Sequence, residues 1–131
     1  MKILIAEDDF ISRLLLQELL KTYGQAHIAV NGREALAAVR VALESDRPYD
    51  LICLDITMPE MSGQDALREI RLAEETSGVA GQARAKIIMT TALADKDNVV
   101  TARDQHCDSF LVKPIERTRL VGELRRLKLI T

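Results

Sequence analysis

The sequence is poor in the residue types that mark several protein classes. Its 131 residues contain no tryptophan, two tyrosines, two phenylalanines and two cysteines. Because aromatic residues make up only 3% of the chain, aliphatic side chains must fill a folded core. The two cysteines, Cys53 and Cys107, lie in separate apolar stretches without CxxC or Cys/His spacing. This argues against a disulfide framework or a zinc site, and it predicts buried free thiols in a reducing compartment.

Long apolar runs and a large excess of one charge are also missing. No run approaches the ~18 residues of a membrane span, and residues 2–6 form a strand-like stretch in place of a signal peptide. The formal net charge is −2, so no overall positive field would attract nucleic acid or an anionic membrane. We therefore expect a cytoplasmic protein that binds neither membranes nor, directly, nucleic acid.

Short β-rich runs alternate with longer amphipathic runs along the chain. The run YDLICLD at residues 49–55 is nearly all apolar, which is typical of a central strand covered on both faces. Five strand-then-helix units predict a single α/β domain, a doubly wound (βα)5 fold with a five-stranded parallel sheet between helices. The predicted strands are residues 2–6, 26–30, 49–55, 86–91 and 109–113, and the predicted helices are residues 10–23, 31–44, 64–75, 98–105 and 116–129.

Polar side chains stand at the carboxyl ends of four of the predicted strands. A single acid after a strand is usually a helix cap or a solvated loop residue, but four such strand ends together favour one site. In open parallel sheets, ligands bind at this edge, near the switch in strand order. The polar residues at these ends are Glu7, Asp8, Asp9, Asp55, Thr90, Thr91 and Lys113.

The chemistry of this set suits a hard cation and a phosphoryl group. Converging carboxylates without histidine or cysteine favour a cation held by oxygen, such as Mg2+. Two unit charges ~4 Å apart at an effective dielectric of ~20 repel by about 4 kcal/mol, which a divalent ion and a lysine would offset. A carboxylate can also attack phosphorus, provided that a metal, an ammonium and hydroxyl donors neutralise the transferred group. The candidates are Asp55 as acceptor, Glu7 and Asp8 as metal ligands, Thr91 as hydroxyl donor and Lys113 as ammonium.

Four motifs, ILIAEDDF, LICLDITMPEMSG, IIMTTALAD and DSFLVKPI, resemble those of response-regulator receiver domains of two-component phosphorelays. They occur in matching order over essentially the whole chain, residues 1–131. The resemblance implies the flavodoxin-like strand order 2-1-3-4-5. It also implies that Asp55 accepts a phosphoryl group from a histidine kinase, a phosphotransfer protein or a small donor such as acetyl phosphate, with Mg2+ required. The implied metal ligands are Asp8, Asp55 and the Thr57 backbone carbonyl, with Glu7 acting mainly through water.

The resemblance further implies a conformational switch. The Thr91 hydroxyl would move toward the phosphoryl oxygen and Phe110 would swing inward, although Phe110 read alone is equally a plain core aromatic. The face formed by the fourth helix, fifth strand and fifth helix would then bind a downstream effector, and a phosphorylation-dependent dimer is a further possibility. The peptide between Lys113 and Pro114 is expected to be cis. Asp9 is expected to cap the first helix and not to bind metal.

Two positions depart from the family pattern, and two other functions compete with the receiver interpretation. His106 stands where glycine is common, so we expect the loop there to be shifted. Leu93 cannot hydrogen-bond a hydrolytic water, so we expect slow dephosphorylation. One alternative is a receiver-like interaction module that is not phosphorylated. The other is a Mg2+-dependent phosphohydrolase, which usually has a second acid where this chain has Thr57. The preferred interpretation is a signalling domain that catalyses only its own phosphorylation and dephosphorylation.

Overall fold

The computed structural model describes residues 1–92 and 107–131. The predicted helix over residues 98–105 therefore lies outside the described residues, as do Leu93 and His106. The strands are β1 (Lys2–Ala6), β2 (Gln25–Ala29), β3 (Leu51–Asp55), β4 (Lys86–Thr91) and β5 (Ser109–Val112). The helices are α1 (Phe10–Leu20), α2 (Gly32–Glu44), α3 (Gly63–Thr76) and α5 (Arg117–Arg126), and a short 3-10 helix, η1 (Gly81–Ala83), precedes β4.

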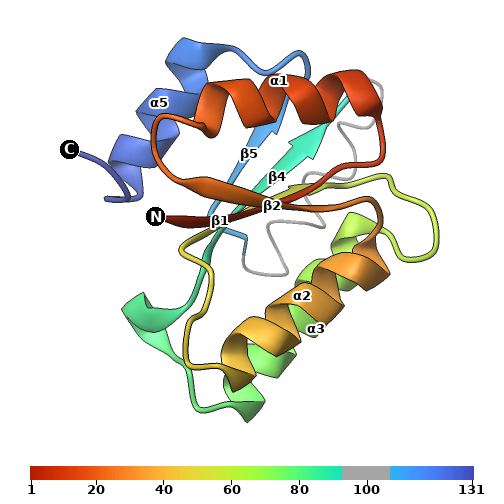
Figure 1. Ribbon diagram of the computed structural model, residues 1–131, viewed down its shortest axis with the longest axis vertical. Helices are drawn as coiled ribbons and strands as arrows, with labels where there is room; N and C mark the ends of the chain where they lie inside the picture. The colour runs from red at the N-terminus through yellow and green to blue at the C-terminus, as the bar shows by residue number, and fades with distance from the viewer. Residues whose placement is uncertain (93–106) are drawn as a thin grey trace.

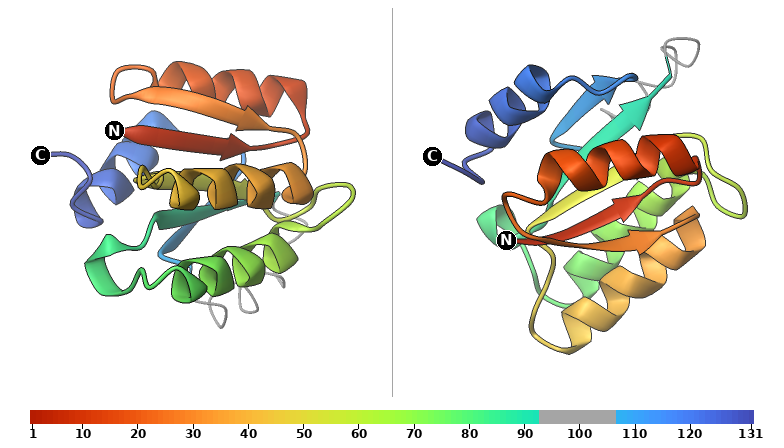
Figure 2. Two further views of the ribbon diagram at one scale, coloured as in Figure 1. Left: turned by 60° about the horizontal axis from the view of Figure 1, so that its bottom comes forward. Right: turned by 45° about the horizontal axis from the view of Figure 1, so that its top comes forward.

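The five strands form one parallel sheet in the order β2-β1-β3-β4-β5, as predicted. Helices α1 and α5 cover one face of the sheet, and α2 and α3 cover the other (Figure 1). Figure 2 shows that β1 lies between β2 and β3, so the strand order reverses beside β1. A ligand site is expected at the carboxyl ends of β1 and β3, on either side of this switch.

The core has two aliphatic layers, one on each face of the sheet. On β1, Ile3 and Ile5 pack toward α1 and α5, whereas Leu4 and Ala6 pack toward α2 and α3. All five residues of β3 are buried, which confirms its prediction as the central strand. Cys53 is buried in this core, but Cys107 is only partly buried, so the prediction of two buried thiols holds for one. None of the helices in the described part of the chain is long and apolar enough to cross a membrane.

Side chains that cap the helices fix where the loops at the carboxyl edge end. The carboxylate of Asp9 accepts a 2.9 Å hydrogen bond from the Ser12 N–H and so caps α1, as predicted. Asn31 caps α2 in the same way, and the side chain of Glu34 reaches back to the N–H of Val30. Each cap typically contributes about 1 kcal/mol to stability. The bonds from Asp9 and Asn31 to the first turns of α1 and α2 also fix where these loops end.

Two helices are shorter than the apolar periodicity predicts. Helix α5 ends at Arg126 because Lys128 adopts a φ of 63° and the Leu129 N–H turns back to the Leu124 carbonyl, a common helix-ending motif. Helix α1 ends at Leu20, where the chain turns toward Gly24. A Cβ on Gly24 would lie 2.0 Å from the Met1 carbonyl oxygen, so only glycine allows this close approach.

Candidate functional site

Three carboxylates meet where β1 and β3 end. Strand pairing places Ala6 beside Leu54, so the next residues, Glu7 and Asp55, are neighbours at the carboxyl edge. One oxygen from each of Glu7, Asp8 and Asp55 lies within 4.8 Å of the others. Glu7 and Asp55 are buried, whereas Asp8 is exposed, which leaves one side of the cluster open to solvent. The three carboxylates at the ends of these strands therefore lie close together.

Lys113, which directly follows β5, contacts both buried carboxylates. Its Nζ lies 2.5 Å from Glu7 Oε1 and 3.2 Å from Asp55 Oδ2. The backbone N–H of Lys113 donates a 2.7 Å bond to the Thr91 carbonyl, which ties the end of β5 to the end of β4. The peptide between Lys113 and Pro114 is cis, as expected. One ammonium thus faces two buried carboxylates and leaves an excess of negative charge.

Burial and crowding shift the pKa values of these groups in opposite directions. Burial raises the pKa of the Asp55 carboxyl to about 7, with Glu7 acting in the same direction and Lys113 against it. Burial alone would raise the pKa of Glu7 as well, but hydrogen bonds with Asp55 and Lys113 outweigh it, so that pKa falls. A proton on Asp55 therefore relieves part of the repulsion near neutral pH. A divalent cation would relieve it more strongly.

The donor set fits Mg2+. Its side-chain ligands are all oxygens, and the exposed Asp8 carboxylate leaves room for the water ligands that Mg2+ usually retains. The exposed Thr57 follows Asp55 at two residues' distance, and its N–H lies 3.4 Å from Asp55 Oδ1. Thr57 thus belongs to the loop that borders the carboxylates, and the predicted role of its carbonyl as a metal ligand stays a prediction.

Gly63 sets the position of the loop after Asp55, a role that the sequence analysis missed. A Cβ on Gly63 would lie 2.0 Å from the Asp55 carbonyl oxygen, and its N–H donates a 2.8 Å bond to the Ile56 carbonyl. Helix α3 therefore begins in direct contact with the end of β3. The sequence does contain a signal for this role: Gly63 directly follows the capping residue Ser62. Glycine destabilises the interior of a helix, so a glycine in the first turn suggests a close backbone contact.

Arg13 is a second contributor that the sequence analysis missed. Its Nη1 donates a 3.1 Å bond to the backbone carbonyl of Glu7, and its guanidinium carbon lies 5.5 Å from the centre of the Phe10 ring. The first turn of α1 is thereby tied to the end of β1. No local pattern indicates this contact, because the chain changes from strand to helix between Glu7 and Arg13.

The two predicted switch residues lie on the neighbouring strands β4 and β5. Thr91 is fully buried at the end of β4, and its hydroxyl donates a 3.1 Å bond to the Ala92 carbonyl. Phe110 lies on β5 opposite Met89, is partly buried and packs against the core on the side of α2 and α3. The predicted movement of both residues would start from these positions.

The sequence as a whole matches a known family. The model for the response regulator receiver domain matches residues 3–125. The chain belongs to this family. As a receiver domain, it is a part of two-component signal transduction, which agrees with the resemblance found in its four motifs.

Relatives place the receiver domain in chains of different lengths. The chemotaxis protein CheY of Thermotoga maritima is 31% identical over 128 residues, which cover 96% of each chain. The hybrid signal transduction histidine kinase L of Dictyostelium discoideum is 34% identical over 120 residues, which cover 91% of this chain and 7% of the kinase. Similar receiver domains thus occur both as short proteins and as small parts of histidine kinases.

Solved structures agree with the fold of this receiver domain. The receiver domain of the histidine kinase CKI1 from Arabidopsis thaliana, complexed with Mg2+ and BeF3−, has a TM-score of 0.83 at 29% identity, covering 97% of this chain and 89% of that one. The co-crystal structure of the Saccharomyces cerevisiae phosphotransfer protein Ypd1 with the receiver domain of Ssk1 gives a TM-score of 0.81 at 26% identity, with coverages of 97% and 88%.

Proposed function

We propose that Asp55 of this receiver domain accepts a phosphoryl group from a histidine kinase or a phosphotransfer protein. The observation that carries this proposal is the contact of one lysine, Lys113, with both Glu7 and Asp55 at the open edge of the sheet. A carboxylate oxygen of Asp55 bonds to phosphorus as the bond from phosphorus to the donor imidazole breaks. The electron pair of that bond stays on the nitrogen, and a donor protonated on its other ring nitrogen leaves as neutral histidine.

Mg2+ would be held by the side chains of Glu7, Asp8 and Asp55 and by the backbone carbonyl of Thr57, with Glu7 acting mainly through water. When bound, it supplies positive charge against the oxygens of the phosphoryl group. Support comes from the all-oxygen donor set. The receiver domain of CKI1, which binds Mg2+ with BeF3−, is a further indication.

Lys113 and Thr91 would act on the phosphorylated form. The ammonium of Lys113 already lies within 3.2 Å of Asp55, so it can pair with a phosphoryl oxygen without a large movement. The Thr91 hydroxyl would exchange its bond to the Ala92 carbonyl for a phosphoryl oxygen, and Phe110 would turn inward. This is a shift in the populations of two conformers. The equilibrium between them can change only by the difference in free energy with which each conformer binds the phosphoryl group.

The changed surface would bind a downstream effector through β5, α5 and the helix predicted at residues 98–105, which lies outside the described residues. We propose that residues 1–131 act as one cytoplasmic signalling domain. In this proposal the domain catalyses only its own phosphorylation and dephosphorylation. A dimer that forms on phosphorylation is compatible with the same face.

A protein donor is favoured by the surface next to Asp55. Helix α1 follows the acidic run Glu7–Asp9 directly and exposes large apolar side chains, and such patches commonly mark protein interaction sites. Phe10 is 59% exposed and Ile11 69%, with Leu14 and Leu15 beside them on the helix. A small donor such as acetyl phosphate needs no surface of this kind, whereas a protein that carries phosphohistidine does.

The experiment that tests the proposal is intact-mass measurement after incubation with acetyl phosphate and Mg2+. The wild-type chain should gain one phosphoryl group, and the gain should disappear with EDTA. Asp55→Asn should gain none while keeping its fold, because the side chains have nearly the same shape. Asp65→Asn is the matched control, since Asp65 is an exposed aspartate on α3 that pairs with the surface residue Arg68.

Equal labelling of Asp55→Asn and wild type would refute Asp55 as the acceptor. A wild-type chain that never gains the group would favour the interaction module that is not phosphorylated. Sustained hydrolysis of generic phosphomonoesters by the wild type, lost in Asp55→Asn, would favour the phosphohydrolase.

A further inference from the structure

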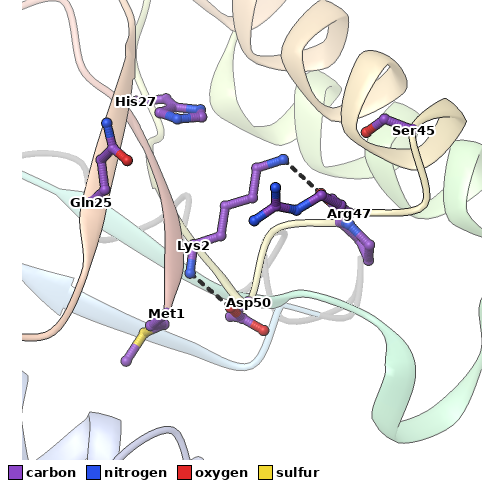
Figure 3. Close-up of a pocket in the computed structure, with 8 residues that line it drawn as sticks. Met1, Lys2, Gln25, His27, Ser45, Arg47 and Asp50 are labelled. Atoms are coloured by element: carbon purple, nitrogen blue, oxygen red, sulfur yellow. Dashed lines mark hydrogen bonds between the residues drawn. The ribbon is translucent and has the colours of Figure 1, made fainter.

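A second polar hollow lies at the opposite end of the sheet from Asp55. It has a volume of about 640 Å³ and is lined by residues from the start of β1, from β2 and from the segment between α2 and β3. This size falls within the range of ~300–1,000 Å³ that is usual for small-molecule sites. Figure 3 shows the side chains of Lys2 and Arg47 entering it, with Gln25 and His27 on the neighbouring strand β2.

The charges that line this hollow are mostly positive. Lys2 and Arg47 contribute two cations, and within the described ranges neither forms an ion pair with a carboxylate. The carboxylate present is Asp50, whose Oδ2 already accepts a 2.7 Å bond from the backbone N–H of Lys2. Asp50 offsets one of the two cations, so the hollow keeps a net positive charge that attracts an anion.

The Lys2 ammonium is held in place by groups that leave its charge uncompensated. Its Nζ donates a 2.6 Å bond to the Arg47 backbone carbonyl and lies 4.7 Å from the centre of the Tyr49 ring. Both contacts orient the ammonium toward the hollow. An ammonium has three N–H donors, so further donors are available to a ligand.

His27 is oriented by the same tyrosine. Its Nδ1 lies 2.8 Å from the Tyr49 hydroxyl, and the two rings meet edge to face with centres 5.5 Å apart. When the hydroxyl donates to Nδ1, the proton of the neutral ring is on Nε2, which faces away from Tyr49. In that tautomer the Nε2 N–H of His27, which also lines the hollow, is a further donor for a ligand.

An apolar hollow of about 410 Å³ adjoins the polar one and shares Lys2, His27 and Ser45 with it. Its remaining lining comes mainly from small apolar side chains of α2, including Ala38 and Val41. Val41 is 65% exposed, so its side chain is open to contact with a ligand. The combined surface has a cationic part and an apolar part that meet at His27.

We propose that this surface binds a small organic oxyanion, a phosphate monoester or a carboxylate, with its charged group on Lys2, Arg47 and His27 and its apolar part against α2. Lys2 begins β1 and Asp50 precedes β3, whereas Glu7 and Asp55 lie at the other ends of the same strands. The surface therefore binds independently of phosphorylation at Asp55, and the proposal does not rest on that function.

The test is a titration of the full chain, followed by the amide and imidazole NMR signals of Gln25, His27 and Asp50. The probes are inorganic phosphate, phenyl phosphate and benzoate, in EDTA so that the carboxylate site holds no metal. The protein carries no tag at its amino terminus, because Met1 also lines the hollow. Phenyl phosphate or benzoate should move these signals at lower concentration than inorganic phosphate, and the tighter of the two identifies the anionic group.

Arg47→Gln should weaken binding about tenfold or more, the usual effect of losing one charged hydrogen bond. Its fold should persist, since the bond to Lys2 uses the backbone carbonyl of Arg47. Arg119→Gln removes an exposed arginine of α5 and should bind like wild type, as should Asp55→Asn. The proposal is overturned if these signals do not respond, if Arg47→Gln and Arg119→Gln bind equally, or if inorganic phosphate binds as tightly as phenyl phosphate.

Discussion

The backbone of Gly63 lies against the carbonyl oxygen of Asp55, so that the first residue of α3 contacts the last residue of β3. The helix and the acidic site are therefore built as one unit. A side chain at residue 63 would have to displace backbone atoms, because its Cβ would come 2.0 Å from that oxygen.

Gly63→Ala should accordingly destabilise the protein by about 1–3 kcal/mol, the usual cost of overpacking, and disturb Mg2+ binding. Gly122→Ala is the matched control. Gly122 lies inside α5 with open space around it, so alanine should stabilise the protein by about 0.5–1 kcal/mol. Urea unfolding measures both values. Equal effects of the two substitutions would contradict the proposed contact.

Lys113→Ala should separate phosphorylation from switching. The variant loses the ammonium that contacts Glu7 and Asp55, but it keeps the acceptor carboxylate and the oxygens expected to bind Mg2+. We expect it to gain a phosphoryl group in the intact-mass assay and to bind its effector poorly afterwards. Normal effector binding by the phosphorylated variant would show that Lys113 is not needed for the switch.

Ile11→Glu should distinguish a protein donor from a small one. Ile11 is 69% exposed on the apolar face of α1, so a charge there costs the free protein little. Transfer from a phosphotransfer protein should slow about tenfold or more, because a desolvated charge would enter the interface. The rate with acetyl phosphate should stay unchanged. Val41→Glu, an exposed apolar site on α2, serves as the control, and equal slowing by both would argue against docking on α1.

Arg71→Met should be among the most destabilising single changes in α3, because the Arg71 side chain is only 10% exposed. Arg71 donates to Glu74, to the Ala85 carbonyl and to Asp108, and Glu74 is only 2% exposed. Removing one partner of such a buried pair costs about 3–5 kcal/mol, because the other charge remains buried.

Arg68→Met is the comparison for this change. It breaks an exposed pair with Asp65 and should cost about 0–1 kcal/mol. Thermal or urea unfolding of both variants measures the difference, and a similar small loss in each would show that the Arg71 cluster is solvated.

Stability below neutral pH should depend in part on Glu123. A hydrogen bond from Arg126 is the main cause that lowers the pKa of this carboxyl below its ordinary value of 4.5, and Ser109 contributes. The folded state therefore binds the proton more weakly than the unfolded state. The resulting stabilisation is present above 4.5 and is lost as the pH falls through the lowered pKa. Glu123→Gln should flatten this part of the stability profile, whereas the exposed Glu75→Gln should not.

The sequence predicted the sheet and the acidic site because both follow from local patterns. Each strand is a short apolar run, and polar residues at the carboxyl ends of parallel strands lie along the same edge of the sheet. The same logic predicted the cap at Asp9. It predicted the neighbourhood of Glu7, Asp55 and Lys113 without any knowledge of their distances.

Other features depend on contacts between distant segments and could not be predicted in this way. Periodicity identified α1 as a helix but did not indicate that Ile11 faces solvent, because that depends on what packs beside the helix. The end of α5 depends on the left-handed conformation of Lys128, a residue with no special preference for it. The contact of Gly63 with Asp55 and the cluster around Arg71 join residues whose approach is set by the complete fold.

The Arg71 cluster also ties α3 to two strands of the sheet. Asp108 accepts a bond from the Ile87 N–H as well as from Arg71, so the cluster fastens α3 to the starts of both β4 and β5. The far ends of these strands carry Thr91 and Lys113, where Thr91 pairs with Val112 and the Lys113 N–H donates a bond to the Thr91 carbonyl. Rearrangement after phosphorylation would thus be smallest near Arg71, at the starts of β4 and β5. It would be largest at the carboxyl edge of the sheet, where the phosphoryl group is attached.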